Sequence, residues 1–352
     1  SLDYNLFSIR TEILLSLLGS AVQMAAFGYC LYLLWSGKIL YGTMTLFLSQ
    51  GAKLSSAFNA LVRTVPSFLS ASVSARRIRD LYALEPEPVL PDDRLDSLAS
   101  QGFTVAVEDA GYAYVPHQPV LTHADFRAAP GETVALVGPS GGGKTTIARL
   151  IPRFFDVQAG AVLLGGRDVR SIPTAELMEQ ISFVFQEVRL FKKSIRDNIR
   201  AARPDATEAE ILHAAQLAQC GDILEKTPGG LDAVIGAKGV YLSGGEMQRI
   251  ALAQAILKDA PIVVLDEASS FADPENEAKI QKAFEALMKD KTVLMIAHRL
   301  STVRNMDRIL VIRDGEIAEE GKHDELLEKG GVYAAMWEEY QKAAQWKVGG
   351  AA

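Results

Sequence analysis

The sequence predicts an α/β domain with a mostly parallel sheet, preceded by two transmembrane helices. Residues 13–37 contain no charged side chain, which is typical of a membrane span. From about residue 102 onwards, short β-like runs alternate with helical stretches. A glycine-rich loop follows one apolar run and precedes a helical one, which is the order found in phosphate-binding loops.

The uncharged run of residues 13–37 is long enough to cross a bilayer. At about 1.5 Å per residue it exceeds the roughly 30 Å of hydrocarbon. Tyr29, Tyr32 and Trp35 cluster toward one end, where interfacial aromatic side chains are common. The alternative is a buried helix of a soluble core, but few soluble helices are apolar on every face for so long. We therefore predict a membrane span.

After a turn at residues 36–38, a second helical stretch covers residues 43–84 and is interrupted by Lys53 and Arg63. Such charges can mark a function, and they can equally well snorkel to the interface or contact a neighbouring helix. Arginines between residues 76 and 79 make the end of this stretch basic, which places that side in the cytoplasm. The sequence thus predicts a multi-pass protein of the cell (inner) membrane, with the following domain cytoplasmic.

The predicted domains follow the changes in composition. Residues 1–84 form a partial transmembrane domain whose second helix extends into the cytosol, and the proline-bearing, acidic residues 85–101 form a linker. Residues 102–345 form the α/β domain. A net charge of -7 and a pI near 5.4, without a basic patch, argue against nucleic acid as a partner. Cys30 and Cys220 lack metal-ligand spacing and are predicted to be packing residues.

The glycine-rich loop predicts binding of a nucleoside triphosphate. Glycines allow the backbone to turn tightly and to aim N–H groups at an anion, and the next helix presents its positive end. Lys144 can reach the outer phosphates and the hydroxyl of Thr145 can hold Mg²⁺. An ordinary glycine turn is the alternative, but the strand before and the helix after argue against it. The predicted phosphate-binding residues are Gly138, Pro139, Ser140, Gly141, Gly142, Gly143, Lys144, Thr145 and Thr146.

Two further motifs indicate a function when they occur together with this loop. The apolar run of residues 262–265 ends in Asp266, a candidate magnesium ligand, and Glu267, which can orient an attacking water. Alone, they would be a common strand end. Residues 242–246 place serine and paired glycines at the start of a helix, which makes an anion site, although a plain capping box has the same pattern.

The order and spacing of these motifs, together with residues 297–299, resemble ATP-binding cassette (ABC) transporters. The resemblance covers nearly the whole chain: residues 102–340 resemble the nucleotide-binding domain, and residues 1–84 resemble the last two membrane helices of an exporter-type half-transporter. It implies the P-loop NTPase fold, with an antiparallel β-subdomain and a helical subdomain beside the parallel sheet. ATP and Mg²⁺ are the implied ligands.

The resemblance also implies roles for single residues. Tyr114 would stack on adenine, with Tyr112 as the rival and a core position as the alternative. Gln186 would touch Mg²⁺ and the water and link to the membrane helices. His298 would contact the γ-phosphate, and Asp273 would connect two such domains. The signature residues that would cap a partner's ATP are Ser243, Gly244, Gly245 and Glu246.

The implied mechanism joins two nucleotide-binding domains head to tail, with ATP between the loop of one and the signature of the other. The partner is a second half-transporter subunit, in a homodimer or a heterodimer, and the lipid bilayer surrounds the helices. Glu267 is the expected base, helped by His298. Hydrolysis would separate the domains and drive the membrane helices between states.

The sequence departs from the family pattern at several positions. Glu246 stands where glutamine is usual, Gln254 where arginine is common, and Ala237 where a loop usually has glutamate. Residues 270–273 differ from the commoner Ser-Ala-Leu-Asp, and the residues after them resemble exporter-fold proteins linked to siderophores. With two membrane helices where six are usual, the sequence is expected to be a C-terminal portion.

Two other functions compete with an exporter subunit. One is a soluble ABC-type ATPase or regulatory module whose first helices only pack, and the other is a catalytically degenerate partner in a heterodimer. Intact Glu267, His298 and Ser243 argue against degeneracy. Lipids, drugs, peptides and siderophores all stay open as substrates. The substrate is expected to contact membrane helices, and the sequence contains two of the usual six.

Overall fold

The computed structural model describes residues 2–84, 104–236, 240–266, 274–297 and 300–349. The chain divides into two compact units, Ser1–Pro88 and Val89–Ala352. The domain boundaries inferred from composition, at residues 84 and 102, stay a prediction. Each unit is described by itself.

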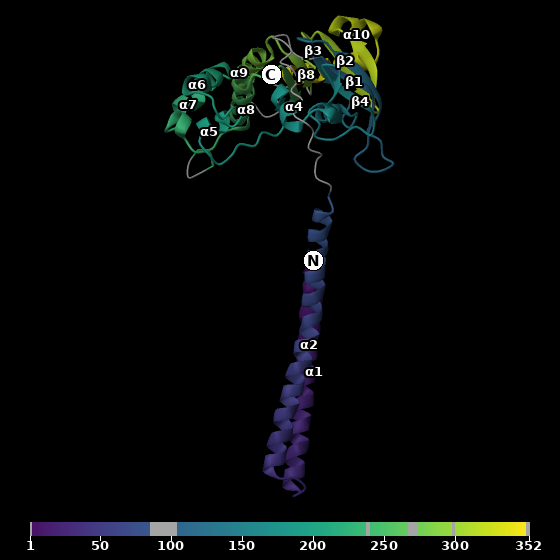
Figure 1. Ribbon diagram of the computed structural model, residues 1–352, viewed down its shortest axis with the longest axis vertical. Helices are drawn as coiled ribbons and strands as arrows, with labels where there is room; N and C mark the ends of the chain where they lie inside the picture. Colours follow the sequence, from purple (N-terminus) through teal and green to yellow (C-terminus); the bar gives the residue numbers. More distant parts are fainter. Residues whose placement is uncertain (1, 85–103, 237–239, 267–273, 298–299, 350–352) are drawn as a thin grey trace. The chain divides into compact units, whose positions relative to one another are not determined.

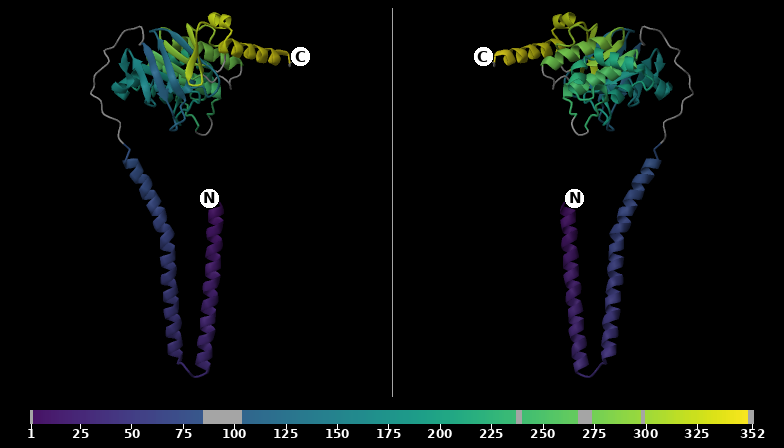
Figure 2. Two further views of the ribbon diagram at one scale, coloured as in Figure 1. Left: turned by 90° about the vertical axis from the view of Figure 1, so that its right-hand side faces the viewer. Right: turned by 90° about the vertical axis from the view of Figure 1, so that its left-hand side faces the viewer.

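The first unit is a hairpin of two long antiparallel helices, α1 (Leu2–Trp35) and α2 (Tyr41–Tyr82) (Figure 1). The two helices diverge away from their short connecting turn (Figure 2). Among the described side chains of this hairpin, Cys30 and Met44, both close to the turn, are the buried ones. Most of the other large apolar side chains described on it are exposed. An apolar surface of this extent needs lipid or further helices to cover it.

The two helices differ in how apolar they are. Within the described residues, one helical window, Leu17–Trp35 of α1, is long and apolar enough to cross a membrane. It lies inside the span predicted at residues 13–37. The second predicted helix also forms, but α2 does not meet the same criterion, because Lys53 and a series of small polar residues lower its apolar character. Passage of α2 through a bilayer is therefore a proposal.

The second unit contains a ten-stranded sheet in its described part, with the order β5-β4-β1-β2-β10-β9-β3-β8-β7-β6 (Figure 1). β9, β3, β8, β7 and β6 pair with one another in parallel, whereas β5, β4, β1 and β2 pair with one another antiparallel. Between the two groups, β10 pairs antiparallel with β9 and parallel with β2. This confirms the predicted parallel sheet with an antiparallel β-subdomain. The strands are β1 (Val105–Tyr112), β2 (Leu121–Ala128), β3 (Thr133–Val137), β4 (Ala159–Leu164), β5 (Arg167–Asp168), β6 (Ile181–Val184), β7 (Ile262–Asp266), β8 (Thr292–Ile296), β9 (Arg308–Arg313) and β10 (Glu316–Gly321).

Helices α5 to α9 gather on one side of this sheet and confirm the helical subdomain (Figure 1). Local signals set their starts: Thr207 caps α6 by a reciprocal capping box with Glu210, and Ser194 caps α5 through the N–H of Asp197. The helices are α3 (Lys144–Leu150), α4 (Thr174–Gln180), α5 (Ile195–Arg200), α6 (Glu208–Leu217), α7 (Gly221–Lys226), α8 (Gly244–Lys258), α9 (Pro274–Met288), α10 (His323–Lys329) and α11 (Val332–Gly349).

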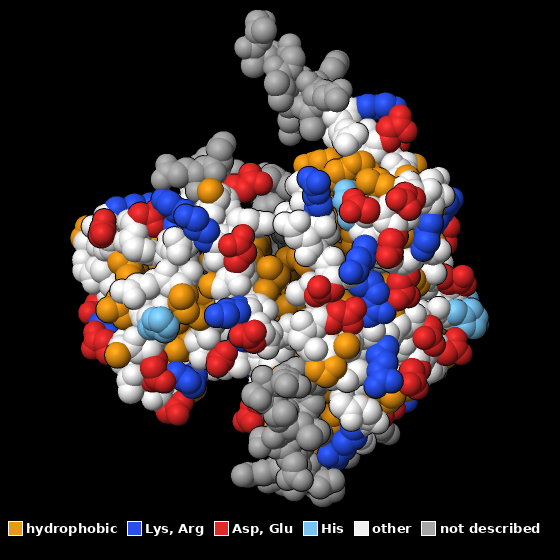
Figure 3. All heavy atoms as spheres, turned by 90° about the horizontal axis from the view of Figure 1, so that it is seen from above, with side chains coloured by type: hydrophobic (Ala, Val, Ile, Leu, Met, Phe, Trp, Pro, Cys, Tyr) orange, Lys and Arg blue, Asp and Glu red, His pale blue; other side chains and the backbone are white. Residues whose placement is uncertain are grey.

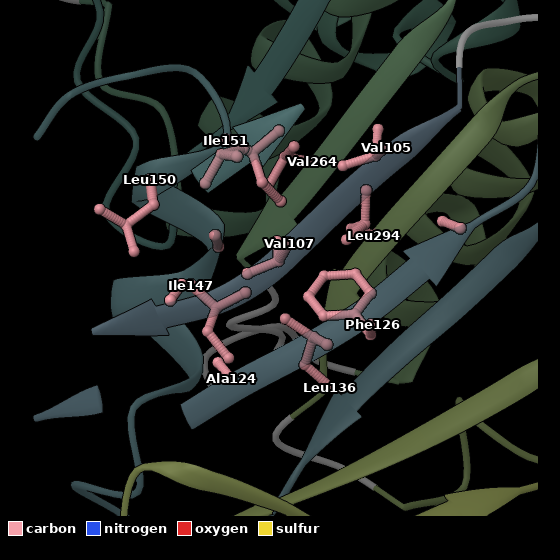
Figure 4. Packing of buried hydrophobic residues seen from close by; sticks show 14 of the residues in the cluster. Val105, Val107, Ala124, Phe126, Leu136, Ile147, Leu150, Ile151, Val264 and Leu294 are labelled. Carbon is pink, nitrogen blue, oxygen red and sulfur yellow. The ribbon is translucent and has the colours of Figure 1, made fainter. Parts of the chain in front are cut away.

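Alternating side chains of the parallel strands supply separate cores. In β7, Val264 packs against the α3 side whereas Val263 packs against the helical subdomain. In β3, Leu136 faces the α3 side and Ala135 faces α10 and α11. Figure 4 shows the first of these cores, in which side chains of β1 and β2 meet those of α3 and the parallel strands. This packing holds the start of α3 in place.

The antiparallel and parallel parts of the sheet are joined by few backbone contacts. β10 pairs with β2 through one residue pair, Glu316 with His123. Beside it, the N–H of Thr122 donates to the carbonyl of Gly315 at 3.2 Å, and the Thr122 hydroxyl donates to Glu316 Oε1 at 3.0 Å. Side-chain packing in the first core therefore carries most of the connection.

Charges of both signs are spread over the surface. Figure 3 shows acidic and basic side chains interspersed over the face that is seen. Both cysteines, Cys30 and Cys220, are buried and free, which confirms their prediction as packing residues.

Candidate nucleotide site

The glycine-rich loop connects β3 to α3, as the sequence predicts. Gly138, Gly141 and Gly143 have φ values of +142°, +81° and +107°, which side chains other than hydrogen rarely adopt. A Cβ on Gly138 would lie 2.0 Å from the carbonyl oxygen of Ile312, and one on Gly143 would lie 2.6 Å from Leu121 Cδ2. The loop is thus an open cradle of backbone, pressed against β9 and β2, with N–H groups available for an anion.

Gly138→Ala is expected to destabilise the second unit by about 3 kcal/mol or more, because both the backbone conformation and the Ile312 carbonyl exclude a methyl group. Gly141→Ala is the matched control. Its φ is also positive but the space around it is open, so it should lose only about 1–2 kcal/mol. Thermal unfolding of the two variants measures the difference, and equal losses would contradict the steric role of Ile312.

Lys144, the first residue of α3, is 7% exposed. Its ammonium group donates to the carbonyl oxygens of Gly138 and Pro139, both at 2.8 Å. Burial lowers the pKa of Lys144, and the charge of Asp266 opposes this shift. The cation therefore lies within the cradle and faces a carboxylate. Of the other loop residues, Pro139, Ser140 and Gly141 are exposed, Gly142 and Thr146 are buried, and Thr145 is half-buried.

The carboxyl ends of four neighbouring parallel strands lie at the same edge of the sheet as this loop. β3 pairs with β8, β8 with β7 and β7 with β6, all in parallel. Asp266, which is 4% exposed, ends β7. Gln186 lies two residues beyond the end of β6 and is exposed. Phosphate loop, carboxylate and amide thus come from three strands that finish at one edge.

Three predicted site residues, Glu267, His298 and Asp273, lie outside the described residues. The residues before the first two are placed, since Asp266 ends β7 and Ala297 follows β8. The roles of Glu267, His298 and Asp273 stay predictions.

Tyr114 lies beyond the end of β1 and touches the phosphate-binding region. Its hydroxyl is 3.3 Å from Thr146 Oγ1, and its ring meets Tyr112 and Phe155 edge to face at 5.0 and 5.4 Å. Tyr114 is 46% exposed whereas Tyr112 is 9% exposed. Of these two tyrosines, Tyr114 is therefore the one whose ring offers an accessible surface for a base, which favours it over its rival.

The signature serine, Ser243, is the N-cap of α8. Its hydroxyl accepts the N–H of Glu246 at 3.3 Å, and Glu246 Oε2 accepts the N–H of Ser243 at 2.8 Å, so both halves of a capping box form. Ser243 and Gly244 are exposed, whereas Gly245 and Glu246 are buried. The positive end of a 15-residue helix is thus presented to solvent.

An ion-pair cluster around a buried arginine, which sequence reasoning missed, holds α8 to its neighbours. Arg249 is fully buried, and its guanidinium donates to Asp222 of α7 at 2.6 Å and to Asn276 of α9 at 2.9 Å. Lys279 also donates to Asp222, at 2.9 Å. A charged residue in the interior of an apolar helical pattern was the available signal, since a buried arginine needs a partner.

The stability of the second unit is expected to depend on Asp222 at acid pH. Burial alone would raise the pKa of Asp222, but the hydrogen bonds from Arg249 and Lys279 hold it at about 2, below the ordinary 3.8. Because the folded state favours the carboxylate, its contribution is present above about pH 4 and is lost as the pH falls toward 2. Urea unfolding should show Asp222→Asn less stable near neutral pH, with the difference shrinking on acidification. A difference in stability that does not change with pH would contradict this role of Asp222.

Gln254 replaces the arginine common in the resembling family and has its own partner. Its amide donates to the carbonyl of Asn198 in α5 at 2.7 Å. Asn198 is buried, and its side chain bonds the backbone of Phe191 in both directions, at 2.8 and 3.1 Å. The substitution therefore keeps a link between α8 and the segment that follows Gln186. Ala237 lies outside the described residues.

Comparison with known proteins gives a consistent result. Residues 121–270 match the family model described as ABC transporter. The chain is 45% identical over 258 residues to the ATP-dependent lipid A-core flippase of Chromobacterium violaceum, covering 73% of this chain and 44% of the relative. It is 44% identical over 273 residues to the mycobactin import ATP-binding/permease protein IrtA of Mycolicibacterium thermoresistibile, covering 76% of this chain and 30% of the relative.

A solved structure supports the same relationship. The structure of a bacterial Atm1-family ABC exporter with ATP bound aligns with a TM-score of 0.68 at 32% identity, over 93% of this chain and 57% of that chain. The chain spans about half the length, or less, of the curated relatives it matches. From its motifs, its fold and these similarities, the chain belongs to the ABC transporter family, with the ATP-binding domain of the exporter-type half-transporters.

Proposed function

We propose that the chain binds ATP with Mg²⁺, hydrolyses it, and couples hydrolysis to translocation of a substrate across a membrane. The observation that carries the proposal is the meeting of the backbone cradle, the buried cation of Lys144 and the strand-end carboxylate of Asp266 at one edge of the sheet. A loop that excludes a Cβ at Gly138 and Gly143, with the ammonium group of Lys144 held against its carbonyls, fits a triphosphate. The hydroxyl, amide and carboxylate oxygens of Thr145, Gln186 and Asp266 fit Mg²⁺.

The residues would divide the work of phosphoryl transfer. Tyr114 stacks on the base, Lys144 balances charge on the outer phosphates, and the loop amides orient them. Bound Mg²⁺ would neutralise charge that develops on the phosphates. Glu267 is the proposed base for the attacking water, with His298 and Gln186 beside it.

We further propose that two such domains pair, with the signature of one on the ATP of the other. The exposed start of α8, with Ser243 and Gly244 at the surface, supports this pairing because it offers a helix N-terminus to an anion. The partner is a second half-transporter subunit, identical or different, and Asp273 is the proposed link between the two domains.

The helical hairpin is proposed to lie in the cell (inner) membrane, with the second unit in the cytoplasm. Its exposed apolar side chains and the span Leu17–Trp35 support this location. The names of the relatives point to different substrates, lipid A-core in one case and mycobactin in the other. The proposal therefore concerns ATP-driven transport and not one substrate.

Membrane extraction tests the proposal together with ATP hydrolysis. We expect the chain to remain in the membrane fraction after alkaline carbonate washing and to hydrolyse ATP only when Mg²⁺ is present. Release by the wash, with hydrolysis intact, would favour the soluble ABC-type module instead. This second outcome has to be tested because α2 is less apolar than α1.

A further inference from the structure

A carboxylate lies where the proposed pairing must accept a phosphate. Glu246 is 6% exposed, and its Oε2 atom accepts the N–H of Ser243, the residue that caps α8. The same helix end is positive and would attract the triphosphate of a partner. A carboxylate charge within the first turn repels that phosphate unless a cation balances it.

Lys226 supplies a cation at this carboxylate. It is the last residue of α7 and its ammonium group contacts Glu246 Oε1, so both carboxylate oxygens have partners. The Lys226 side chain is 53% exposed, whereas that of Glu246 is 8% exposed. Burial alone would raise the pKa of Glu246, but the hydrogen bonds from Lys226 and Ser243 outweigh it and lower the pKa. The carboxylate is therefore ionised and its charge is balanced.

The buried cation of α8, Arg249, has other partners. Arg249 lies one turn beyond Glu246, but its guanidinium is held by Asp222, by the carbonyl of Gln219 and by Asn276. Its charge is therefore balanced by Asp222 and not by Glu246. Lys226 is the cation that contacts Glu246.

We propose that Lys226 is a positioning residue for ATP-dependent pairing: by neutralising Glu246 it keeps the start of α8 able to accept the γ-phosphate bound by a second subunit. This inference rests on the proposed function and adds a contribution from α7 to the same site. Lys226 acts through Glu246 and not by touching the phosphate. Its loss should therefore matter only while Glu246 carries a charge.

The test uses the full 352-residue chain in detergent, with Glu267→Gln to suppress turnover. Light scattering measures the ATP concentration that gives half-maximal dimerisation. Lys226→Met should raise this concentration by about tenfold, which corresponds to about 1.4 kcal/mol. In a chain that already carries Glu246→Gln, adding Lys226→Met should change it by less than about twofold. Lys282→Met, at an exposed lysine of α9, removes the same charge and should have no effect.

A second readout separates this role from a structural one. Binding of a fluorescent ATP analogue to the dilute, monomeric chain depends on the phosphate loop and should be the same with and without Lys226→Met. An equal loss of dimerisation with and without the Glu246→Gln substitution would overturn the inference, because Lys226 would then bind phosphate itself or only support the fold. Failure of the parent Glu267→Gln chain to dimerise at any ATP concentration would instead refute the proposed pairing, and the inference with it.

Discussion

Lys144→Ala is expected to lower the affinity for ATP by about a hundredfold or more, or about 2.7 kcal/mol, and to abolish hydrolysis. Lys144 is 7% exposed, and its ammonium group is held in the cradle by the carbonyls of Gly138 and Pro139. Its removal takes away the cation that would face the outer phosphates and also two bonds that shape the loop. Titration with a fluorescent ATP analogue measures the affinity, and phosphate release measures turnover.

Lys258 provides a matched control. It too is a lysine whose pKa is lowered by burial, and its ammonium group donates to the carbonyl of Ile181 at 2.7 Å. Lys258→Ala should reduce stability while leaving the affinity for ATP within about twofold of the parent. If Lys144→Ala and Lys258→Ala weaken ATP binding equally, Lys144 has no specific role at the phosphates.

Glu267→Gln is expected to reduce turnover by about a thousandfold and to preserve the binding of ATP. Glutamine keeps the size of the side chain but cannot accept a proton from the attacking water. The ATP-bound dimer should therefore accumulate, which size-exclusion chromatography with ATP and Mg²⁺ can detect. Glu285→Gln, at an exposed position of α9, is the control for the loss of one negative charge. Unchanged turnover in Glu267→Gln would remove this residue from the role of base.

The phosphate loop is the part of the fold that the sequence predicts best. Its ends are marked by residues that act locally: Val137 closes an apolar strand, and the positive φ of Gly143 begins α3. The start of α8 is equally local, because the capping box of Ser243 and Glu246 spans one turn. Such signals need no knowledge of the rest of the chain.

Contacts between distant segments could not be predicted. Lys226 and Glu246 are 20 residues apart on different helices, and nothing in either sequence neighbourhood pairs them. The sequence likewise does not indicate that the antiparallel strands β1 and β4 are neighbours, because many other strand pairings are possible. The resemblance pointed to Tyr114 with Tyr112 as the rival, and only the structure shows that the two tyrosines differ in burial.

The membrane prediction shows the limit of a pattern based on charge alone. The run of residues 13–37 predicted the apolar part of α1, yet the helix itself begins at Leu2, because polar residues such as Arg10 and Glu12 continue it. For α2, helical length was predicted well, but length does not establish apolar character. Small residues such as Ser55 and Ser56 favour contact with other helices as much as with lipid.

The small number of backbone contacts between β2 and β10 has a consequence for the geometry of the nucleotide site. Tyr114 follows β1 of the antiparallel part, and Lys144 follows β3 of the parallel part. The apolar side chains packed between these two parts therefore set the spacing between the base-binding and the phosphate-binding residues. A substitution in this core, such as Ile147→Val, would therefore alter the spacing between these two sets of residues. The dimensions of the nucleotide site thus depend on the packing of the apolar core.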